Sequence, residues 1–261
     1  MRTPSSFRAA KRKGEKLATL TAYDSSFAQA AARAGCDSVL VGDSLGMVIQ
    51  GQRGTTGVTV DDVAYHVRCV AAGAPDLHVM ADLPFGSFEA GPAAAFKSAA
   101  RLVAAGAHMV KVEGGAALAR TVGRLVERGV PVCGHVGLLP QSANATGFRV
   151  QGKDRESRAR ILADAKAISD AGAALLVLEM IPAELAAEIT AEVAASTIGI
   201  GAGASCDGQI LVLQDLLGLY PNPPRFAKNF LRGKGDIDAA LAAYVADVRA
   251  GRFPDAAHTP A

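Results

Sequence analysis

Short, uninterrupted apolar runs alternate with longer Ala-rich stretches along most of the chain. Each run carries Val, Ile or Leu at consecutive positions and is too short for an isolated helix. Such runs are typical of parallel strands that are buried on both faces. The pattern therefore predicts strands at 17–23, 38–42, 78–82, 109–113, 131–135, 175–179, 197–201 and 210–213.

The stretches between these runs have the ends and the periodicity of amphipathic helices. Pro92 and Gly106 bound one of them, because proline favours the first turn of a helix and glycine favours its end. Within it, we expect an apolar stripe that faces the core, formed by Phe96, Ala100, Val103 and Ala104. An Ala-Gly pair precedes several of the predicted strands, which indicates a helix–turn–strand unit that is used repeatedly.

Eight strand–helix units in 261 residues favour an α/β fold of the (β/α)8 TIM-barrel type. The alternative is an open, doubly wound sheet, but no GxGxxG follows the first predicted strand. We expect residues 1–261 to form a single domain, with flexible termini at about 1–14 and 252–261. The loops at 45–59 and 137–153 are long for such a barrel, and loops of that length often serve as lids or binding loops.

The amino-acid composition limits which binding partners and which cellular compartment we expect. Half of the residues are hydrophobic and the net charge is +2, which indicates neither a nucleic acid nor a membrane as partner. The four cysteines lie in apolar runs without CxxC spacing, as expected of buried, reduced thiols. No secretory signal and no apolar run of ~18 residues is present, so we expect a cytoplasmic protein. We expect the basic cluster of Lys11, Arg12, Lys13 and Lys16 to be a solvated leader.

Polar residues recur at the C-terminal ends of the predicted strands. In a closed barrel these ends converge on one mouth, where barrel enzymes hold their active sites. Taken singly, each residue has an ordinary structural explanation, such as a helix cap, a surface ion pair or a buried structural histidine. Their recurrence at equivalent positions of successive units predicts a functional site. The residues are Asp43, Ser44, Asp82, Lys111, Glu113, His135 and Glu179.

The carboxylates of this set suggest a metal ion. Lys111 and Glu113 lie two positions apart on a strand, so both point to one face. If that face is the barrel lumen, Glu113 lies beside Asp43 and Asp82, and burying three carboxylates together is costly unless a cation neutralises them. An all-oxygen set suits Mg²⁺ better than zinc. We therefore predict that Asp43, Asp82 and Glu113 form a Mg²⁺ site with positions open for a bidentate α-keto acid.

Several long segments around these residues occur in the order found in one enzyme family. They are LVGDSLGMVIQG (40–51), ADLPFGSF (81–88), KVEGG (111–115), GHVGLLPQS (134–142), LEMIPAELA (178–186) and IGIGAGASCDGQILVLQDLLG (198–218). With these motifs the chain resembles the ketopantoate hydroxymethyltransferases over about residues 15–250. Phe88 stands where that family would have Tyr, and Ala227 where Val is common, and both lie away from the predicted site.

The resemblance implies a role for each of the site residues. Mg²⁺ would be bound by Asp43 and Asp82, with Glu113 as a third ligand or as an acceptor beside the ligands. Glu179 would be the proton acceptor. From its position at the mouth, and not from the resemblance, we expect His135 to donate a hydrogen bond to substrate. The residues that bind the keto acid would be Asp43, Ser44, Asp82, Lys111 and His135.

The resemblance also implies the reaction and the partners. A one-carbon unit would pass from 5,10-methylenetetrahydrofolate to 3-methyl-2-oxobutanoate, giving 2-dehydropantoate for pantothenate and coenzyme A synthesis. Chelation by Mg²⁺ would stabilise the enolate that forms when C3 loses its proton. Members of the family assemble as homo-oligomers, often decamers, so the resemblance implies an oligomer here. The sequence names no residue that binds the folate.

Three other functions remain open at this point. In a metal-independent aldolase, Lys111 would form a Schiff base with the keto acid. A Mg²⁺-dependent carbon–carbon lyase could use the same barrel without folate. A third alternative is a barrel that binds small metabolites without turnover.

Overall fold

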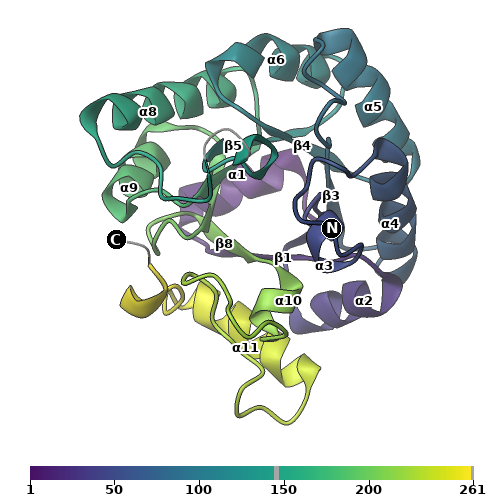
Figure 1. Cartoon of the computed structure of the whole chain (residues 1–261), viewed down its shortest axis with the longest axis vertical. Helices are drawn as coiled ribbons and strands as arrows, with labels where there is room; N and C mark the ends of the chain where they lie inside the picture. Colours follow the sequence, from purple (N-terminus) through teal and green to yellow (C-terminus); the bar gives the residue numbers. More distant parts are fainter. Residues whose placement is uncertain (144–146, 260–261) are drawn as a thin grey trace.

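The computed structural model contains a closed barrel of eight parallel strands that neighbour one another in chain order (Figure 1). The structure describes residues 1–143 and 147–259. The barrel confirms the predicted fold class and excludes the open sheet. Small differences occur at strand ends, since β1 ends at Thr21 and β8 begins at Gly208. The strands are β1 (Leu17–Thr21), β2 (Ser38–Val41), β3 (His78–Asp82), β4 (Met109–Glu113), β5 (Val132–Gly137), β6 (Leu175–Glu179), β7 (Ser196–Ile200) and β8 (Gly208–Leu211).

Helices surround most of the barrel (Figure 1). Residues of every strand are buried, as expected of a parallel sheet covered on both faces. The α-helices are α1 (Pro4–Lys13), α2 (Ser25–Ala34), α3 (Leu45–Val48), α4 (Val60–Gly73), α5 (Pro92–Ala104), α6 (Ala119–Glu127), α8 (Arg155–Asp170), α9 (Ala183–Glu192), α10 (Leu213–Leu216) and α11 (Ile237–Arg249). The 3-10 helices are η1 (Ala116–Leu118), η2 (Pro140–Ser142) and η3 (Ala256–His258).

The connection from β7 to β8 departs from the predicted strand–helix repeat. Residues 201–207, all of which the structure describes, join the two strands through turns and contain no helix. Gly201 and Gly203 have φ values of 60° and 78°, so the chain reverses within a few residues. The prediction of eight strand–helix units was therefore wrong at this connection. Helix α11 closes the ring instead by packing against α2 and β1.

The buried face of α5 also differs from the prediction. Ala95, Ala99 and Leu102 are buried, whereas Phe96 and Val103 are 39% and 42% exposed. Small side chains on the inner face let the helix pack closely on the sheet, which a phenylalanine there would prevent. The predicted stripe was therefore on the wrong side of the helix, and apolar side chains remain exposed on its outer face.

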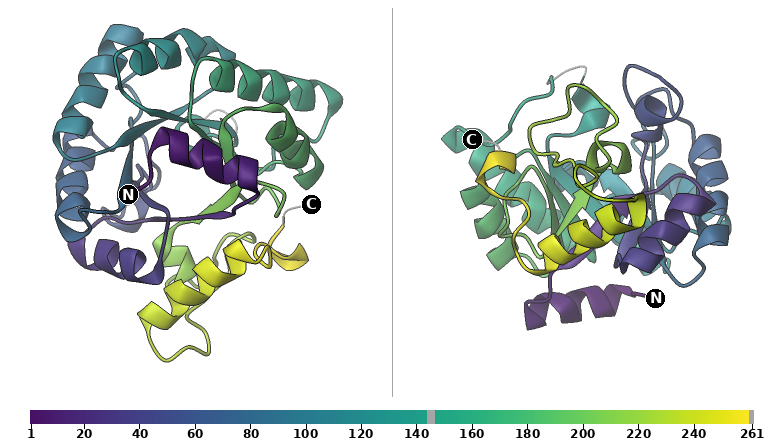
Figure 2. Two further views of the ribbon diagram at one scale, coloured as in Figure 1. Left: turned by 180° about the vertical axis from the view of Figure 1, so that it is seen from behind. Right: turned by 90° about the horizontal axis from the view of Figure 1, so that it is seen from below.

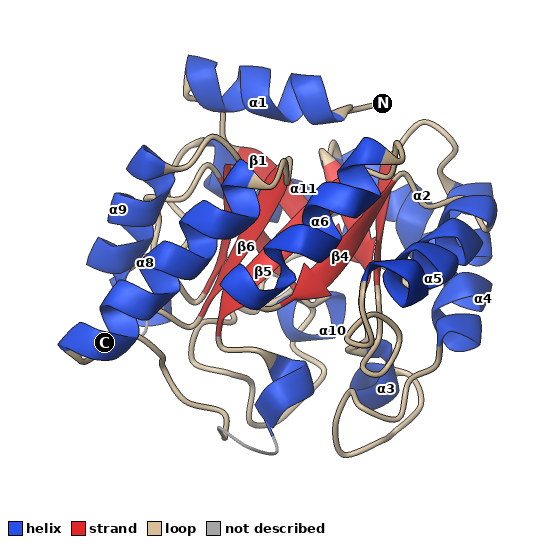
Figure 3. Cartoon of the chain, turned by 90° about the horizontal axis from the view of Figure 1, so that it is seen from above, coloured by secondary structure: helices blue, strands red, loops and turns tan. Residues whose placement is uncertain are grey.

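Helix α1 lies across the N-terminal end of the barrel, opposite to α3 and α10 (Figures 2 and 3). Phe7 is buried there, and its ring contacts that of His78 edge-on at 5.0 Å between centroids. Lys11 Nζ forms an ion pair of 2.8 Å with Asp207 and donates to the Thr190 carbonyl. Lys16 Nζ donates to the Cys206 carbonyl. The prediction of a solvated basic leader was therefore wrong for both lysines, because they tie this end of the chain to the barrel.

Both segments for which we predict flexibility carry regular structure. Residues 1–14 contain α1, and residues 252–261 contain η3, whose N-terminus Asp255 caps. Their mobility and the single-domain organisation stay predictions.

Cys36, Cys133 and Cys206 are buried and Cys69 is partly buried, all as free thiols. In the described part of the chain, none of the helices combines the length and apolar character needed to cross a membrane.

Candidate active site

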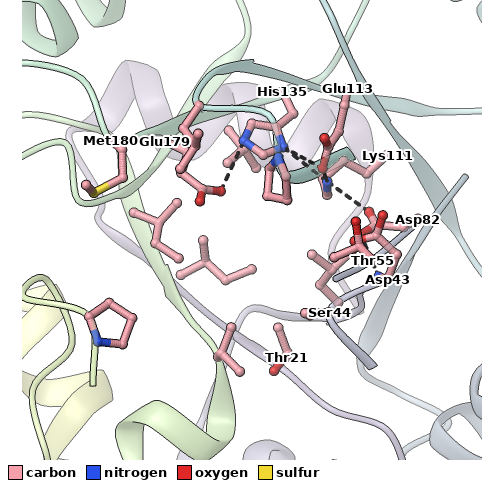
Figure 4. Close-up of a pocket in the computed structure, with 18 of the residues that line it drawn as sticks. Thr21, Asp43, Ser44, Thr55, Asp82, Lys111, Glu113, His135, Glu179 and Met180 are labelled. Atoms are coloured by element: carbon pink, nitrogen blue, oxygen red, sulfur yellow. Dashed lines mark hydrogen bonds and ion pairs between the residues drawn. The ribbon is translucent and has the colours of Figure 1, made fainter. Parts of the chain in front are cut away.

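The parallel register brings the predicted site residues together at the C-terminal ends of the strands. Asp82 of β3 lies beside Lys111 of β4, and Glu113 of β4 lies beside His135 of β5. Glu179 ends β6 beside Gly137. All seven predicted residues line one cavity of about 470 Å³. In Figure 4, Asp43 and Asp82 lie on one side of this cavity and Glu179 lies on the other.

Asp43 and Ser44 are held in place directly after β2. The Asp43 backbone N–H donates to Asp82 Oδ2 at 2.9 Å, which joins the ends of β2 and β3. Ser44 Oγ lies 2.8 Å from the buried Tyr23 hydroxyl. A Cβ atom at Gly42 would lie 2.8 Å from Ser44 Oγ, so only glycine leaves this arrangement undisturbed. The segment VGDS is thus shaped so that both polar side chains face the cavity.

Lys111 lies between two carboxylates at the bottom of the site. Its Nζ is 3.1 Å from Asp82 Oδ1 and 3.4 Å from Glu113 Oε1. Burial lowers the pKa of Lys111, but the charges of Asp82 and Glu113 outweigh burial and raise it above its usual range. A Schiff base requires a neutral amine. This environment keeps Lys111 protonated, and so argues against the aldolase alternative.

His135 connects Lys111 and Glu113 with Glu179. Its Nδ1 lies 3.2 Å from Lys111 Nζ and 3.4 Å from Glu113 Oε1, and its Nε2 lies 3.2 Å from Glu179 Oε2. Burial and Lys111 lower the pKa of His135, but Glu113 and Glu179 raise it to about 9. Both ring nitrogens therefore face protein side chains, with Glu179 on the cavity side (Figure 4).

The three buried carboxylates do not behave alike. Burial and the neighbouring Asp82 raise the pKa of Asp43 well above its usual range, and burial raises that of Asp82. Burial opposes the ionisation of Glu113, but Lys111 and His135 lower its pKa to about 2. Glu113 is thus compensated by protein groups. Asp43 and Asp82 carry the excess negative charge.

A divalent cation fits this excess. With Asp43, Asp82, Glu113 and Glu179 ionised, Lys111 and a protonated His135 leave two negative charges uncompensated. Asp82 Oδ1 is buried and receives no hydrogen bond of good geometry from the described residues. Across the same residues, no three His, Cys, Asp or Glu side chains are arranged to hold a metal ion by themselves. Mg²⁺ requires no such cage, because it is commonly bound through one or two carboxylates, with water and substrate oxygens as the other ligands.

Gln141 is a site residue that the sequence analysis did not single out. Its side-chain amide donates to Asp43 Oδ2 at 2.8 Å and to the Leu83 carbonyl at 3.0 Å. Its backbone N–H donates to Glu113 Oε2 at 3.0 Å. Both carboxylate oxygens of Glu113 therefore face protein groups. The signals in the sequence were the position of Gln141 in the long loop after β5 and its place in the segment GHVGLLPQS (134–142), and neither indicated a contact with Asp43.

Met180 follows Glu179 with an unusual backbone conformation. Its φ is 49°, in the left-handed region that side chains other than glycine rarely adopt. The Met180 N–H donates to the Ile200 carbonyl, and its carbonyl accepts from the Gln151 N–H. These bonds hold the strained residue in place, and such strain is commonly found at functional sites.

Comparisons with known proteins agree with the geometry. Residues 2–256 match the family model described as ketopantoate hydroxymethyltransferase. A 3-methyl-2-oxobutanoate hydroxymethyltransferase of Thiobacillus denitrificans is 56% identical over 98% of both chains. Another, from Azoarcus sp., is 56% identical over 94% of this chain and 92% of its own.

Solved structures with the same fold are more distant in sequence. A putative phosphonomutase from Burkholderia cenocepacia superposes with a TM-score of 0.65 at 18% identity, covering 83% of this chain and 93% of its own. A phosphonopyruvate hydrolase in complex with oxalate and Mg²⁺ gives a TM-score of 0.64 at 13% identity, covering 84% of both chains. At these identities the likeness shows a common fold.

Proposed function

The chain belongs to the ketopantoate hydroxymethyltransferase family and is a hydroxymethyltransferase, and from this we propose its substrates and the roles of its site residues. The proposed reaction transfers the one-carbon unit of 5,10-methylenetetrahydrofolate to C3 of 3-methyl-2-oxobutanoate. Water supplies the hydroxyl oxygen, and the products are 2-dehydropantoate and tetrahydrofolate. The product would enter pantothenate and coenzyme A synthesis in the cytoplasm.

One observation carries this proposal. A candidate base, Glu179, lies across one cavity from a group of two carboxylates and a lysine. Asp43, Asp82 and Lys111 line one side, and Glu179 lies on the other (Figure 4). An α-keto acid whose carboxylate and keto oxygens occupy the first side would present C3 to Glu179. This arrangement suits proton abstraction next to a carbonyl group.

In the proposed mechanism, the Glu179 carboxylate removes the proton from C3. The electron pair of the C–H bond becomes the C2–C3 double bond, and negative charge moves to the keto oxygen. Lys111 and the Ser44 hydroxyl stabilise that charge from the opposite side. C3 then attacks the methylene carbon of the ring-opened folate iminium, and the electron pair of the C=N bond returns to N5. Water then displaces N5 from that carbon, which leaves a hydroxymethyl group on C3 and releases tetrahydrofolate, whose N5 takes a proton. His135 orients Glu179 in this scheme, in place of the substrate contact expected from the sequence.

We assign the Mg²⁺ site to Asp43 and Asp82. When bound, Mg²⁺ would supply positive charge to the keto and carboxylate oxygens of the substrate. Glu113 takes the other role left open by the sequence, that of an acceptor beside the ligands, because both of its oxygens face Lys111, His135 or Gln141. Its function is then to fix the positions of Lys111 and Gln141.

We also propose that the chain forms a homo-oligomer, with a decamer as one candidate. Exposed apolar side chains on the outer faces of α4 and α5 support this: Tyr65, Phe96 and Val103. Apolar side chains gathered on a surface commonly mark a protein interface.

The experiment that tests the proposed function is exchange of the C3 proton of 3-methyl-2-oxobutanoate with solvent deuterium, followed by proton NMR. We expect exchange with Mg²⁺ present and folate absent, and its loss on chelation. Addition of 5,10-methylenetetrahydrofolate should then give 2-dehydropantoate. Absence of exchange under every condition would contradict the proposed base and its substrate.

A further inference from the structure

Thr55 is a buried polar residue of the cavity to which the proposed mechanism gives no role. It lies in the long segment between α3 and α4, and it lines the cavity together with Asp43 and Asp82. Thr55 is 3% exposed, whereas its neighbour Thr56 is exposed. In Figure 4, Thr55 lies on the same side of the cavity as the two aspartates. A hydroxyl group is therefore buried beside the proposed cation site.

The Thr55 hydroxyl has no partner in the described part of the chain. Three buried side-chain atoms of cavity residues lack a hydrogen bond of good geometry there, namely Thr55 Oγ1, Asp82 Oδ1 and His135 Nε2. Asp82 Oδ1 still lies 3.1 Å from Lys111 Nζ. His135 Nε2 still lies 3.2 Å from Glu179 Oε2. Thr55 Oγ1 has neither kind of contact, and a buried hydroxyl without a partner destabilises a fold.

The packing of the segment around Thr55 does not explain its hydroxyl. The Gln52 N–H donates to the Gly46 carbonyl at 2.8 Å, and the Val58 N–H donates to the Thr55 carbonyl at 3.1 Å. A Cβ atom at Gly46 would lie 2.7 Å from Val58 Cγ2, and one at Gly57 would overlap the Gln52 side chain. The segment is thus held by backbone hydrogen bonds and by the close approach of two glycines. The hydroxyl of Thr55 takes no part in these contacts.

A hydrated divalent cation would supply the missing partner. Mg²⁺ keeps several of its waters when it is bound through one or two carboxylates, and the hydrogen atoms of those waters require acceptors. One oxygen of each aspartate already accepts from the protein, since Asp43 Oδ2 accepts from Gln141 and Asp82 Oδ2 accepts from the Asp43 N–H. A threonine hydroxyl can accept as well as donate. The Thr55 hydroxyl is therefore an acceptor beside the aspartates that none of the described groups uses.

We propose that Thr55 is a positioning residue of the cation site, an assignment that rests on the proposed function. Its hydroxyl accepts a hydrogen bond from a water molecule of the cation that Asp43 and Asp82 hold. Fixing this water favours one orientation of the hydrated cation and leaves its other positions for the oxygens of the keto acid. Thr55 thus acts on the cation through water, whereas Gln141 acts through the carboxylate of Asp43.

The substitution Thr55→Val tests this role, because valine has nearly the shape of threonine and lacks the hydroxyl. Binding of Mn²⁺ without substrate, measured by electron paramagnetic resonance, should weaken about tenfold, as is typical when a group that supports a metal site is lost. Thr55→Ser keeps the hydroxyl and should bind Mn²⁺ with close to the wild-type affinity. Thr56→Val makes the same change at the exposed neighbour and is the matched control.

The stability of the metal-free protein distinguishes a positioning role from a structural one. The hydroxyl has no partner until the cation is bound, so with a chelator present Thr55→Val should melt at or above the wild-type temperature. Added Mn²⁺ should then raise the melting temperature of the variant less than that of the wild type. A lower melting temperature of Thr55→Val in the chelator would show a structural role and overturn the inference.

The Mn²⁺ measurements also separate this inference from the proposed function. Wild-type affinity in Thr55→Val would overturn the role of Thr55. Equally weak binding in Thr55→Val and Thr55→Ser would overturn it too, because the shape of the side chain would then account for the effect. A wild-type protein that binds no Mn²⁺ would instead overturn the proposed cation site, and the role of Thr55 with it.

Discussion

Gln141 and Asp43 are joined by a hydrogen bond of 2.8 Å, although they lie 98 positions apart in the sequence. The side-chain N–H of Gln141 donates to Asp43 Oδ2, and this bond fixes the orientation of the carboxylate. Asp43 Oδ1 is not bound by Gln141. The same residue binds Glu113 through its backbone. The loop after β5 therefore fixes two of the three buried carboxylates.

We predict that Gln141→Leu weakens metal binding. Removing a group that orients a metal-binding carboxylate typically costs about 10–100-fold in affinity. Binding of Mn²⁺, measured by electron paramagnetic resonance without substrate, gives this affinity directly. Gln151→Leu is a suitable control, because among the described residues the Gln151 side chain donates to the Arg149 carbonyl and to no group of the cavity. Equal Mn²⁺ affinity in the two variants would argue against a positioning role.

Substitution Glu179→Gln should retain binding of the keto acid and lose exchange at C3. The amide cannot accept the proton, and loss of a general base commonly costs about 10²–10⁴-fold in rate. Proton NMR measures the exchange, and calorimetry measures the binding. Glu184→Gln, on the exposed first turn of α9, should exchange normally. Undiminished exchange in Glu179→Gln would eliminate this residue as the base.

A methyl group at Gly42 should disturb binding of the keto acid. In Gly42→Ala the new Cβ would lie 2.8 Å from Ser44 Oγ and 3.4 Å from Asp82 Oδ2, so at least the serine must move. We expect the dissociation constant for 3-methyl-2-oxobutanoate to rise about tenfold. Gly54→Ala, with open space around the added carbon, should bind as the wild type does. Calorimetric titration of both variants measures the difference.

His78 should make the fold less stable in mild acid. Burial and the neighbouring His108 lower its pKa to about 4, although the Arg2 carbonyl, which accepts from Nδ1, opposes this shift. The folded state thus keeps His78 neutral, whereas the unfolded chain protonates it at about 6.5. The stabilisation is present above that pH and is lost as the pH falls from about 6.5 towards 4, by about 2 kcal/mol at about pH 5.

Urea unfolding at about pH 7 and about pH 5 measures this contribution when the wild type is compared with His78→Gln. The variant keeps a side-chain donor and has no titrating ring, so its stability should fall less over the same interval. An equal fall in both proteins would contradict the assignment to His78. His108, which lies next to His78 at 5.5 Å between ring centroids, is unchanged in the comparison.

The outer face of α5 should govern assembly. Phe96→Glu places a charge among exposed apolar side chains, so we expect the variant to sediment as a smaller species than the wild type. Lys97→Glu, on the same helix and exposed, changes charge without removing an apolar contact. Sedimentation velocity distinguishes the species. A monomeric wild type would contradict the proposed oligomer.

Most of the barrel could be predicted from the sequence because its strands are buried on both faces. Their continuous apolar runs, such as Leu175–Glu179, have few alternative explanations. The convergence of the polar residues that follow these strands could be predicted equally well, because the C-terminal ends of the strands meet at one mouth in any closed barrel. The buried face of helix α5 could not be predicted. Its Ala-rich sequence places apolar residues on both faces, so periodicity does not show which face is buried.

The residues that were missed share a different property. Gln141 reaches Asp43 from the loop after β5, and Tyr23 reaches Ser44 from the end of β1, which neighbours β2. A glutamine in a loop and a tyrosine after a strand have many ordinary roles. Only the three-dimensional arrangement shows that one holds Asp43 and the other holds Ser44.

The position of α1 has a practical consequence for attaching the enzyme to a surface. Met1 is exposed, and α1 lies at the end of the barrel opposite to α3 and α10 (Figure 3). The cavity lies at the other end, among the residues that follow the strands. A linker joined to the first residue would therefore hold each subunit with its mouth directed away from the support. Biosensor measurements of keto acid or folate binding could use such a tether without obstructing the approach of either molecule.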